Sequence, residues 1–199
     1  MKTNNVPVLF AVTLLFFAMV PLMSSAGVPE GELYEVGPLK PVDSTLKVKV
    51  GDTAPDFTLR AVSGGTVSLG DYAGKKNVMI SFVPAAWTPV CSDQWPGYIL
   101  AWEEFERLDT VVLGISTDNV PTLFAWTRTM GPLWFPVLSD FWPHGRTAEA
   151  YGVLRTDGTT ERAIIIVDKQ RVIRAIDVHD INKRPPLEWI MDELEKLNK

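Results

Sequence analysis

The residue with the clearest potential for chemistry is Cys91, the only cysteine among the 199 residues. Before it, the apolar run 78–83 predicts a buried strand that ends at Pro84, and Pro89 suits the first turn of a helix. Cys91 is therefore expected at a helix N-terminus, where unpaired backbone N–H groups and the helix dipole favour a thiolate over a thiol. Because the thiolate is the reactive form of cysteine, this strand-to-helix junction is the strongest candidate for an active site.

Two further residues of the junction form a pattern with the cysteine, because Pro84, Thr88 and Cys91 are spaced as Pro-x-x-x-Thr-x-x-Cys. This spacing resembles the active-site signature of the peroxiredoxins, the thiol peroxidases of the alkyl hydroperoxide reductase and thiol-specific antioxidant group. The resemblance extends to ordered blocks at 51–57, 135–140 and 162–168. It implies a thioredoxin-like α/β fold and a thiol-dependent peroxidase that reduces hydrogen peroxide or organic hydroperoxides through a cysteine sulfenic acid.

Such a reaction needs more than an acidic thiol. Lowering the pKa of a thiol from about 8.5 to about 6 raises the thiolate fraction roughly thirtyfold. The same change makes each thiolate less nucleophilic and lowers its rate constant by a factor of roughly twenty, so the net gain in rate is small. Most of the acceleration must come from donors that orient the peroxide and stabilise the departing oxygen. By the resemblance, these donors are the Thr88 hydroxyl and the guanidinium of Arg162, just before the apolar run 164–167.

The resemblance also gives supporting roles to neighbours of the cysteine. Pro84 would shield the thiolate from solvent. Gln94 stands three residues after Cys91, where the family often has Glu or Gln, and would support the site from behind. Trp87 is not part of the resemblance: it is most simply a core or interface aromatic, and its position beside the site would let it shape access. Other possible guanidinium donors, which we rank below Arg162, are Arg128, Arg146 and Arg155.

Each of these residues also has an ordinary structural interpretation. A lone cysteine on the apolar side of a junction is often buried filler. Thr88 alone would be a helix N-terminal residue, and Arg162 alone would be a solvated charge at a strand edge. The pattern that they form together favours the catalytic interpretation.

The absence of a second cysteine departs from the commonest pattern of the family. No resolving cysteine can come from this chain or from an identical subunit, so a sulfenic acid at Cys91 would need an external thiol or a thioredoxin-like reductant. The only histidines, His144 and His179, give no recognisable metal spacing with one cysteine. No metal and no cofactor are implied.

Two rival functions use the same fold. The first is a thiol-disulfide exchanger, in which Trp87-Thr88-Pro89-Val90-Cys91 would derive from a Trp-Cys-x-x-Cys motif whose attacking cysteine has become Thr88. Thioredoxin-like exchangers also carry a proline before the strand that faces the motif, whereas 159–162 contains none and offers Arg162 instead. The second is a non-catalytic binding domain, which would react slowly with peroxide.

The N-terminal part of the sequence predicts an exported protein. Lys2, an apolar stretch and the small residues Ser24 and Ala26 indicate a signal peptide over 1–26 that is cleaved after Ala26, which directs the chain to the periplasm or the outside. An uncleaved membrane anchor is the less favoured alternative, because the stretch is short and contains a proline.

Residues 27–48 are interpreted as a linker and 49–199 as one domain. The net charge of −5 argues against nucleic acid as a partner, and a homodimer is implied only by the resemblance.

The pattern of the domain predicts the elements that hold the site. Extended runs at 55–60 and 66–69 flank a Gly64-Gly65 turn, and richer apolar runs at 78–83, 111–115 and 164–167 indicate strands that are covered on both faces. Helices are expected over 90–108, where Pro96 should kink or delay the regular turns, over 120–129 and 147–151, and after 185–186. A strand at 171–178 should pair with 164–167. The predicted fold class is α/β, with a central mixed sheet flanked by helices.

Overall fold

The computed structural model describes residues 31–198, so the predicted signal peptide and the first residues of the linker lie outside the described residues. Within 31–198 the chain forms one seven-stranded sheet in the order β2-β1-β5-β4-β3-β6-β7. Its strands are β1 (Thr58–Ala61), β2 (Thr66–Ser68), β3 (Asn77–Phe82), β4 (Thr110–Ser116), β5 (Val137–Ser139), β6 (Arg162–Val167) and β7 (Ile173–His179). The helices are α1 (Pro89–Leu100), α2 (Trp102–Arg107), α3 (Val120–Arg128), α4 (Arg146–Tyr151) and α5 (Leu187–Lys196), with a 3₁₀ turn η1 (Leu69–Tyr72).

The sheet is mixed, as its sequence pattern predicts. Strands β3, β4 and β5 run parallel, whereas β6 pairs antiparallel with β3, and β7 pairs antiparallel with β6. The hairpin β1–β2 turns at the predicted Gly64-Gly65 pair, where both residues have a positive φ that favours glycine. This order of elements confirms the thioredoxin-like α/β fold.

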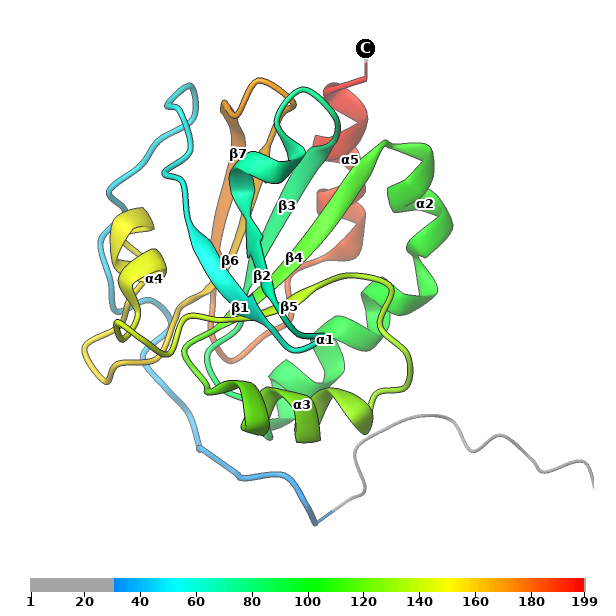
Figure 1. The fold of residues 1–199 in the computed structure, drawn as a ribbon. Coiled ribbons are helices and arrows are strands. Elements are labelled where there is room, and N and C mark those ends of the chain that lie inside the picture. Colours follow the sequence, from blue (N-terminus) through cyan, green and yellow to red (C-terminus); the bar gives the residue numbers. More distant parts are fainter. Residues whose placement is uncertain (1–30, 199) are drawn as a thin grey trace, which may run out of the picture.

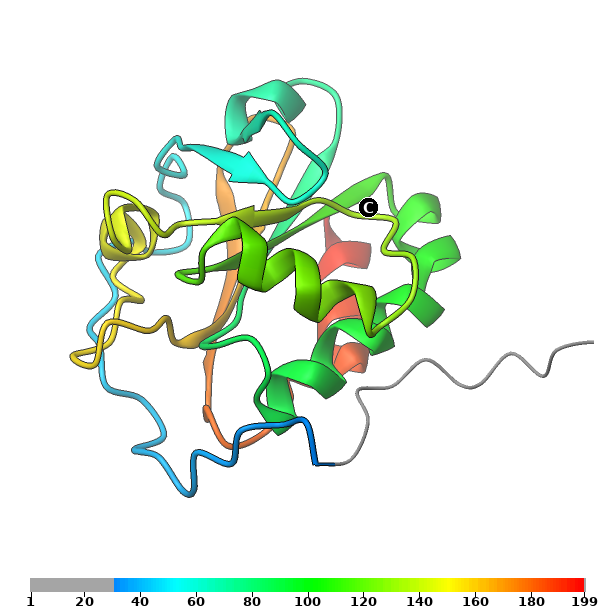
Figure 2. The ribbon, with the colours of Figure 1, turned by 60° about the horizontal axis from the view of Figure 1, so that its bottom comes forward.

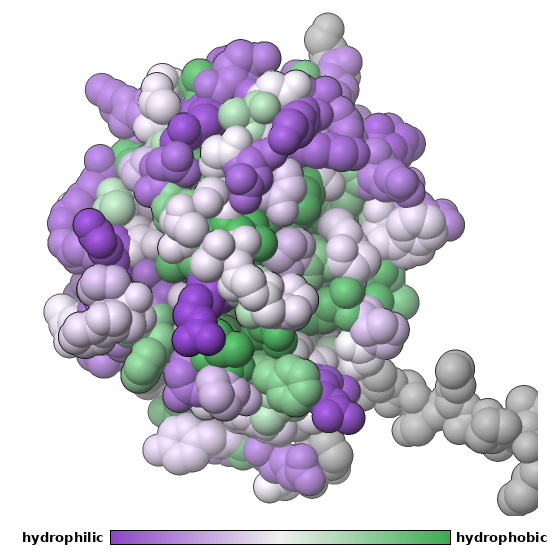
Figure 3. All heavy atoms as spheres, in the orientation of Figure 1, coloured by the Kyte–Doolittle hydropathy of each residue, from purple (hydrophilic) through white to green (hydrophobic). Residues whose placement is uncertain are grey.

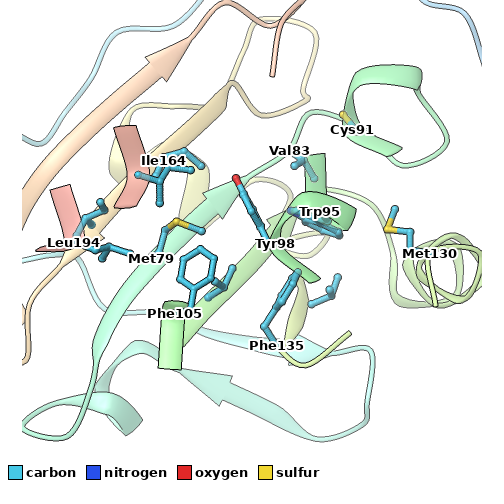
Figure 4. Close-up of a cluster of buried hydrophobic side chains, with 14 of the residues drawn as sticks. Met79, Val83, Cys91, Trp95, Tyr98, Phe105, Met130, Phe135, Ile164 and Leu194 are labelled. Atoms are coloured by element: carbon cyan, nitrogen blue, oxygen red, sulfur yellow. The ribbon is translucent and has the colours of Figure 1, made fainter. Parts of the chain in front are cut away.

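Helices flank the central sheet (Figures 1 and 2), and two buried clusters hold these layers together. Side chains alternate between the faces of a strand, so Met79 and Ile80 of β3 point to opposite sides. Met79 packs in the cluster that contains α1, α2, α3 and α5, which Figure 4 shows in close-up. Ile80 packs in the cluster that contains α4 and the β1–β2 hairpin. The central strands are therefore covered on both faces.

Two local predictions differ from the structure. The helical pattern over 90–108 forms two helices, and the break is at Ala101 rather than at Pro96, which lies inside α1. The carbonyl of Ala101 accepts the N–H groups of Glu104 and Phe105, so this residue opens α2. Strand β5 was not predicted, because its short run follows Pro136 and resembles a loop.

In the described residues, none of the helices has the length and hydropathy that a membrane span requires.

The close approach of β4 to α1 leads to a stability prediction. A Cβ atom on Gly114 would lie 2.7 Å from Cζ2 of Trp95, whose ring is fully buried and packs against Trp126. We expect Gly114→Ala to lower the free energy of unfolding by about 1–3 kcal/mol through overpacking. Urea unfolding measures this change. The matched control is Gly97→Ala within α1, where a Cβ meets nothing within 4 Å and should stabilise the helix by about 0.5–1 kcal/mol. Equal effects of the two substitutions would contradict the packing argument.

Candidate active site

Cys91 lies at the first turn of α1, as the junction predicts. Strand β3 ends at Phe82, Thr88 is the extended N-cap residue, and Pro89 occupies the first helical position. The cysteine is fully buried, and Figure 4 shows it near Val83 and Trp95, at the edge of the hydrophobic cluster. The sulfur therefore reacts only with a molecule that enters a cavity beside it.

The register of β3 and β6 brings Arg162 to the cysteine. Ala163 of β6 pairs with Phe82 of β3, and the strands are antiparallel, so the beginning of β6 lies beside the end of β3. Arg162 is the first residue of β6, and its Nη2 lies 3.5 Å from Sγ of Cys91. The two residues are 71 positions apart in sequence, and the sheet alone makes them neighbours.

Hydrogen bonds fix the guanidinium of Arg162, which is 2% exposed. Nε and Nη2 donate to the carbonyl of Ile181 at 3.1 and 3.0 Å, and Nη1 donates to Oε1 of Gln94 at 2.6 Å. A guanidinium has five N–H donors. The contacts among the described residues, with the one to Cys91, use four of them. One N–H group thus remains for a ligand, and the planar guanidinium cannot rotate without losing these hydrogen bonds.

A second layer of contacts fixes Gln94. Its Nε2 donates to Oγ of Ser81 and to the hydroxyl of Tyr98, both at 3.1 Å. The amide carbonyl is thereby turned toward Arg162. Burial raises the pKa of Tyr98, so its hydroxyl stays neutral at physiological pH. Sequence reasoning found Gln94 but missed Ser81 and Tyr98, which look like ordinary strand and helix residues.

Thr88 and Pro84 are buried and lie on the wall of the cavity at Cys91. The Thr88 hydroxyl donates its single proton to the carbonyl of Ala85 at 2.9 Å, so in this structure it does not have the donor role that the resemblance implies, and its oxygen can serve only as an acceptor. The cavity has a volume of about 520 Å³. Its wall comes from the junction (Pro84, Ala85, Thr88, Pro89, Val90, Cys91), from the opposite loops (Asp157, Thr159, Arg162, Ile181, Asn182) and from Tyr34–Leu39.

Trp87 contributes to the site through its main chain and not through its ring. It has a φ of 63°, which is uncommon for a residue with a side chain, and its ring packs against the hydrophobic cluster rather than on the cavity wall. Its carbonyl accepts the N–H of Tyr34 at 2.7 Å. This bond draws the segment before the domain toward the cysteine. The sequence predicts only a linker there, because its Gly and Pro residues give no signal of this contact.

The other arginines lie elsewhere. Arg155 is buried in an ion pair with Glu161 at 2.6 Å, and Arg146 lines a different hollow beside Trp142. Arg128 lies over the ring of Phe124, at a second cavity of about 440 Å³ near α3. Figure 3 shows hydrophobic surface on that face of the molecule. None of the three lines the cavity at Cys91, and among residues 31–198 no three His, Cys, Asp or Glu side chains gather as a metal ion requires.

A thioredoxin-like sheet that presents one cysteine at a helix N-terminus, beside a fixed guanidinium, is typical of a thiol-based redox protein. Comparison with known proteins identifies the group: the family described as AhpC/TSA matches residues 50–176, and the chain belongs to this family.

Individual relatives agree with this assignment. Alkyl hydroperoxide reductase E of Mycobacterium tuberculosis is 41% identical over 128 residues, which are 64% of this chain and 83% of that protein. Peroxiredoxin-2 of Pongo abelii is 38% identical over 143 residues, 67% of this chain and 79% of that protein. The reduced 2-Cys peroxiredoxin of Plasmodium vivax has a TM-score of 0.72 at 27% identity, and the match covers 75% of this chain and 81% of the other.

Proposed function

We propose that this protein is a one-cysteine thiol peroxidase that reduces hydrogen peroxide or organic hydroperoxides at Cys91. The observation that carries the proposal is the fixed Arg162 guanidinium, with Nη2 3.5 Å from Sγ of Cys91. The relatives of this chain include proteins named alkyl hydroperoxide reductase E and peroxiredoxin-2, and these names support the same activity.

The first half of the reaction uses the groups around the cavity. The positive charge of Arg162 stabilises an ionised sulfur, which attacks the terminal oxygen of the hydroperoxide. A sulfur–oxygen bond forms and the O–O bond breaks. The other oxygen leaves with the electron pair and takes up a proton, as water or an alcohol, and Cys91 becomes a sulfenic acid. The remaining N–H group of Arg162 donates to the peroxide, and the Thr88 oxygen accepts its O–H hydrogen.

The second half needs a partner, because the chain has one cysteine. An external thiol condenses with the sulfenic acid, and this step releases water and forms a mixed disulfide. A second thiol then attacks the disulfide and restores Cys91, so two thiols are oxidised for each peroxide reduced. We propose a thioredoxin-like protein or a small thiol as the reductant.

The test is the rate of the first half. The reduced protein is mixed with hydrogen peroxide or cumene hydroperoxide in a stopped-flow instrument, and the tryptophan fluorescence is recorded. Trp95 packs in the same cluster as Cys91 and serves as the probe. We expect at least one peroxide to react far faster than with free cysteine. A rate no higher than that of free cysteine for both peroxides would leave only a binding role for the fold.

Export and assembly are further parts of the proposal. The predicted signal peptide over 1–26 supports export to the periplasm or the outside, and cell fractionation with N-terminal sequencing tests it. We expect mature chains that begin at Gly27, and a cytosolic chain that begins at Met1 would overturn export. The resemblance to peroxiredoxins supports a homodimer. Analytical ultracentrifugation of the reduced protein should give twice the mass of one chain, and a monomer at micromolar concentration would rule out a stable homodimer.

A further inference from the structure

The segment Tyr34–Leu39, here called the strap, crosses the cavity that contains Cys91. It belongs to the blue N-terminal part of the chain in Figures 1 and 2. The N–H of Tyr34 donates to the carbonyl of Trp87 at 2.7 Å. At the other end, the N–H of Leu39 donates to Asn182 Oδ1 at 2.9 Å, and Asn182 Nδ2 donates back to the carbonyl of Leu39 at 2.8 Å. Both ends are therefore fastened to the domain.

The chain just after the strap is held by a buried ion pair. Glu161, which pairs with Arg155, accepts the N–H groups of Asp43 and Ser44 through Oε1 at 2.6 and 2.8 Å. Hydrogen bonds from Thr156 lower the pKa of Asp43, so this carboxylate is ionised at neutral pH. Its contribution to the stability of the fold is lost only at strongly acidic pH, where the carboxylate becomes protonated. Because buried and charged groups fix this stretch, the strap has a defined position over the cavity.

The strap is tied to the same residues that hold the arginine. Glu161 directly precedes Arg162 in the chain. The N–H of Ile181 donates to the carbonyl of Pro41 at 3.1 Å, while the carbonyl of Ile181 accepts from Arg162. The wall that the strap contributes therefore keeps a set distance from the reacting sulfur.

The strap supplies apolar groups to the cavity. Val36, Pro38 and Leu39 lie on its wall, and the facing apolar residues are Pro84, Ala85, Pro89, Val90 and Ile181. The polar groups needed for the reaction, Cys91, Thr88 and Arg162, belong to the same cavity. Ligand pockets typically have volumes of about 300–1,000 Å³, and one water molecule takes about 30 Å³ of the liquid. At about 520 Å³, the cavity is far larger than two peroxide oxygens require.

We propose that the strap determines substrate specificity, and that Val36, Pro38 and Leu39 bind the carbon group of an organic hydroperoxide. This inference rests on the peroxidase function proposed above. The strap precedes residue 50, where the family match begins, so it adds to the common site a wall built by this chain. Organic hydroperoxides gain apolar contacts that hydrogen peroxide cannot make, and the enzyme selects for them.

The experiment compares Val36→Asn with Val42→Asn in the full chain. The two valines are 43% and 38% exposed and lie on the same segment, but only Val36 lines the cavity. Stopped-flow rate constants are measured with cumene hydroperoxide and with hydrogen peroxide. We expect Val36→Asn to lower the ratio of the two constants, cumene over hydrogen peroxide, by roughly tenfold, and Val42→Asn to leave the ratio at the wild-type value.

The outcomes separate the two proposals. If the wild type reacts fast but Val36→Asn leaves the ratio unchanged, or if Val42→Asn lowers it equally, the strap does not determine specificity and the peroxidase function still stands. If the wild type reacts with neither peroxide faster than free cysteine does, the peroxidase function itself is overturned.

Discussion

Replacing Cys91 with serine should abolish peroxide reduction, with a loss of at least about 10⁴-fold in turnover. A serine hydroxyl stays protonated at neutral pH and cannot form a sulfenic acid, and the chain has no other cysteine to take over. The measurement is the consumption of hydrogen peroxide with excess dithiothreitol as reductant. Serine has nearly the same size as cysteine, so the fully buried site should keep its packing.

Urea unfolding of the Cys91→Ser variant provides the control. A transition close to that of the wild type shows that the loss of activity comes from the missing sulfur and not from unfolding. Turnover that persists in a folded Cys91→Ser protein would mean that the peroxide reacts elsewhere, and the assignment of this site would be wrong.

Replacing Arg162 with lysine should slow the reaction with peroxide by about 10²–10³-fold. Lysine keeps the charge but lacks the planar fork, so it cannot bind Ile181 and Gln94 and reach Cys91 at the same time. The loss should appear in the second-order rate constant of sulfenic acid formation, measured by stopped-flow fluorescence. Arg162→Met should lose at least as much, because it also removes the positive charge beside the sulfur.

Arg128→Lys is the matched control for Arg162→Lys. Arg128 lies over Phe124 and does not line the cavity at Cys91, so the same change there should leave the rate constant unaltered. If the folded Arg162→Lys variant reacted as fast as Arg128→Lys, the guanidinium beside the sulfur would have no part in binding or stabilising the peroxide.

Much of the site follows from local sequence. Pro84 and Pro89 mark the end of a strand and the start of a helix, and these marks place Cys91 at the helix N-terminus. The contact between Cys91 and Arg162 does not follow from spacing, since it depends on the antiparallel pairing of β3 with β6. The resemblance to the family implies that pair, whereas the local sequence pattern does not. Gln94 was found in the same way, but its partners Ser81 and Tyr98 had no distinguishing mark.

The strap shows why the rest could not be predicted. Residues 31–47 have little periodicity and form no helix or strand, so a sequence pattern offers nothing to place them. Their position depends on hydrogen bonds with single side chains: the carboxylate of Glu161 accepts from the main chain, and the side-chain amide of Asn182 donates to it. These contacts span more than 100 residues. Strand β5 was missed for a related reason, because three residues after a proline are recognised as a strand only through their neighbours β4 and β1.

The central claim is that the sulfur of Cys91 accepts an oxygen atom from the peroxide. It is tested most directly by adding one equivalent of peroxide to the reduced protein with dimedone present, followed by mass spectrometry of its peptides. Dimedone traps a sulfenic acid, so this experiment separates oxidation at Cys91 from oxidation of the methionines. We predict a dimedone adduct on the peptide that contains Cys91, and no adduct when a reducing thiol is added first. Consumption of the peroxide with Cys91 still a free thiol, and with the oxygen on methionine, would contradict the account.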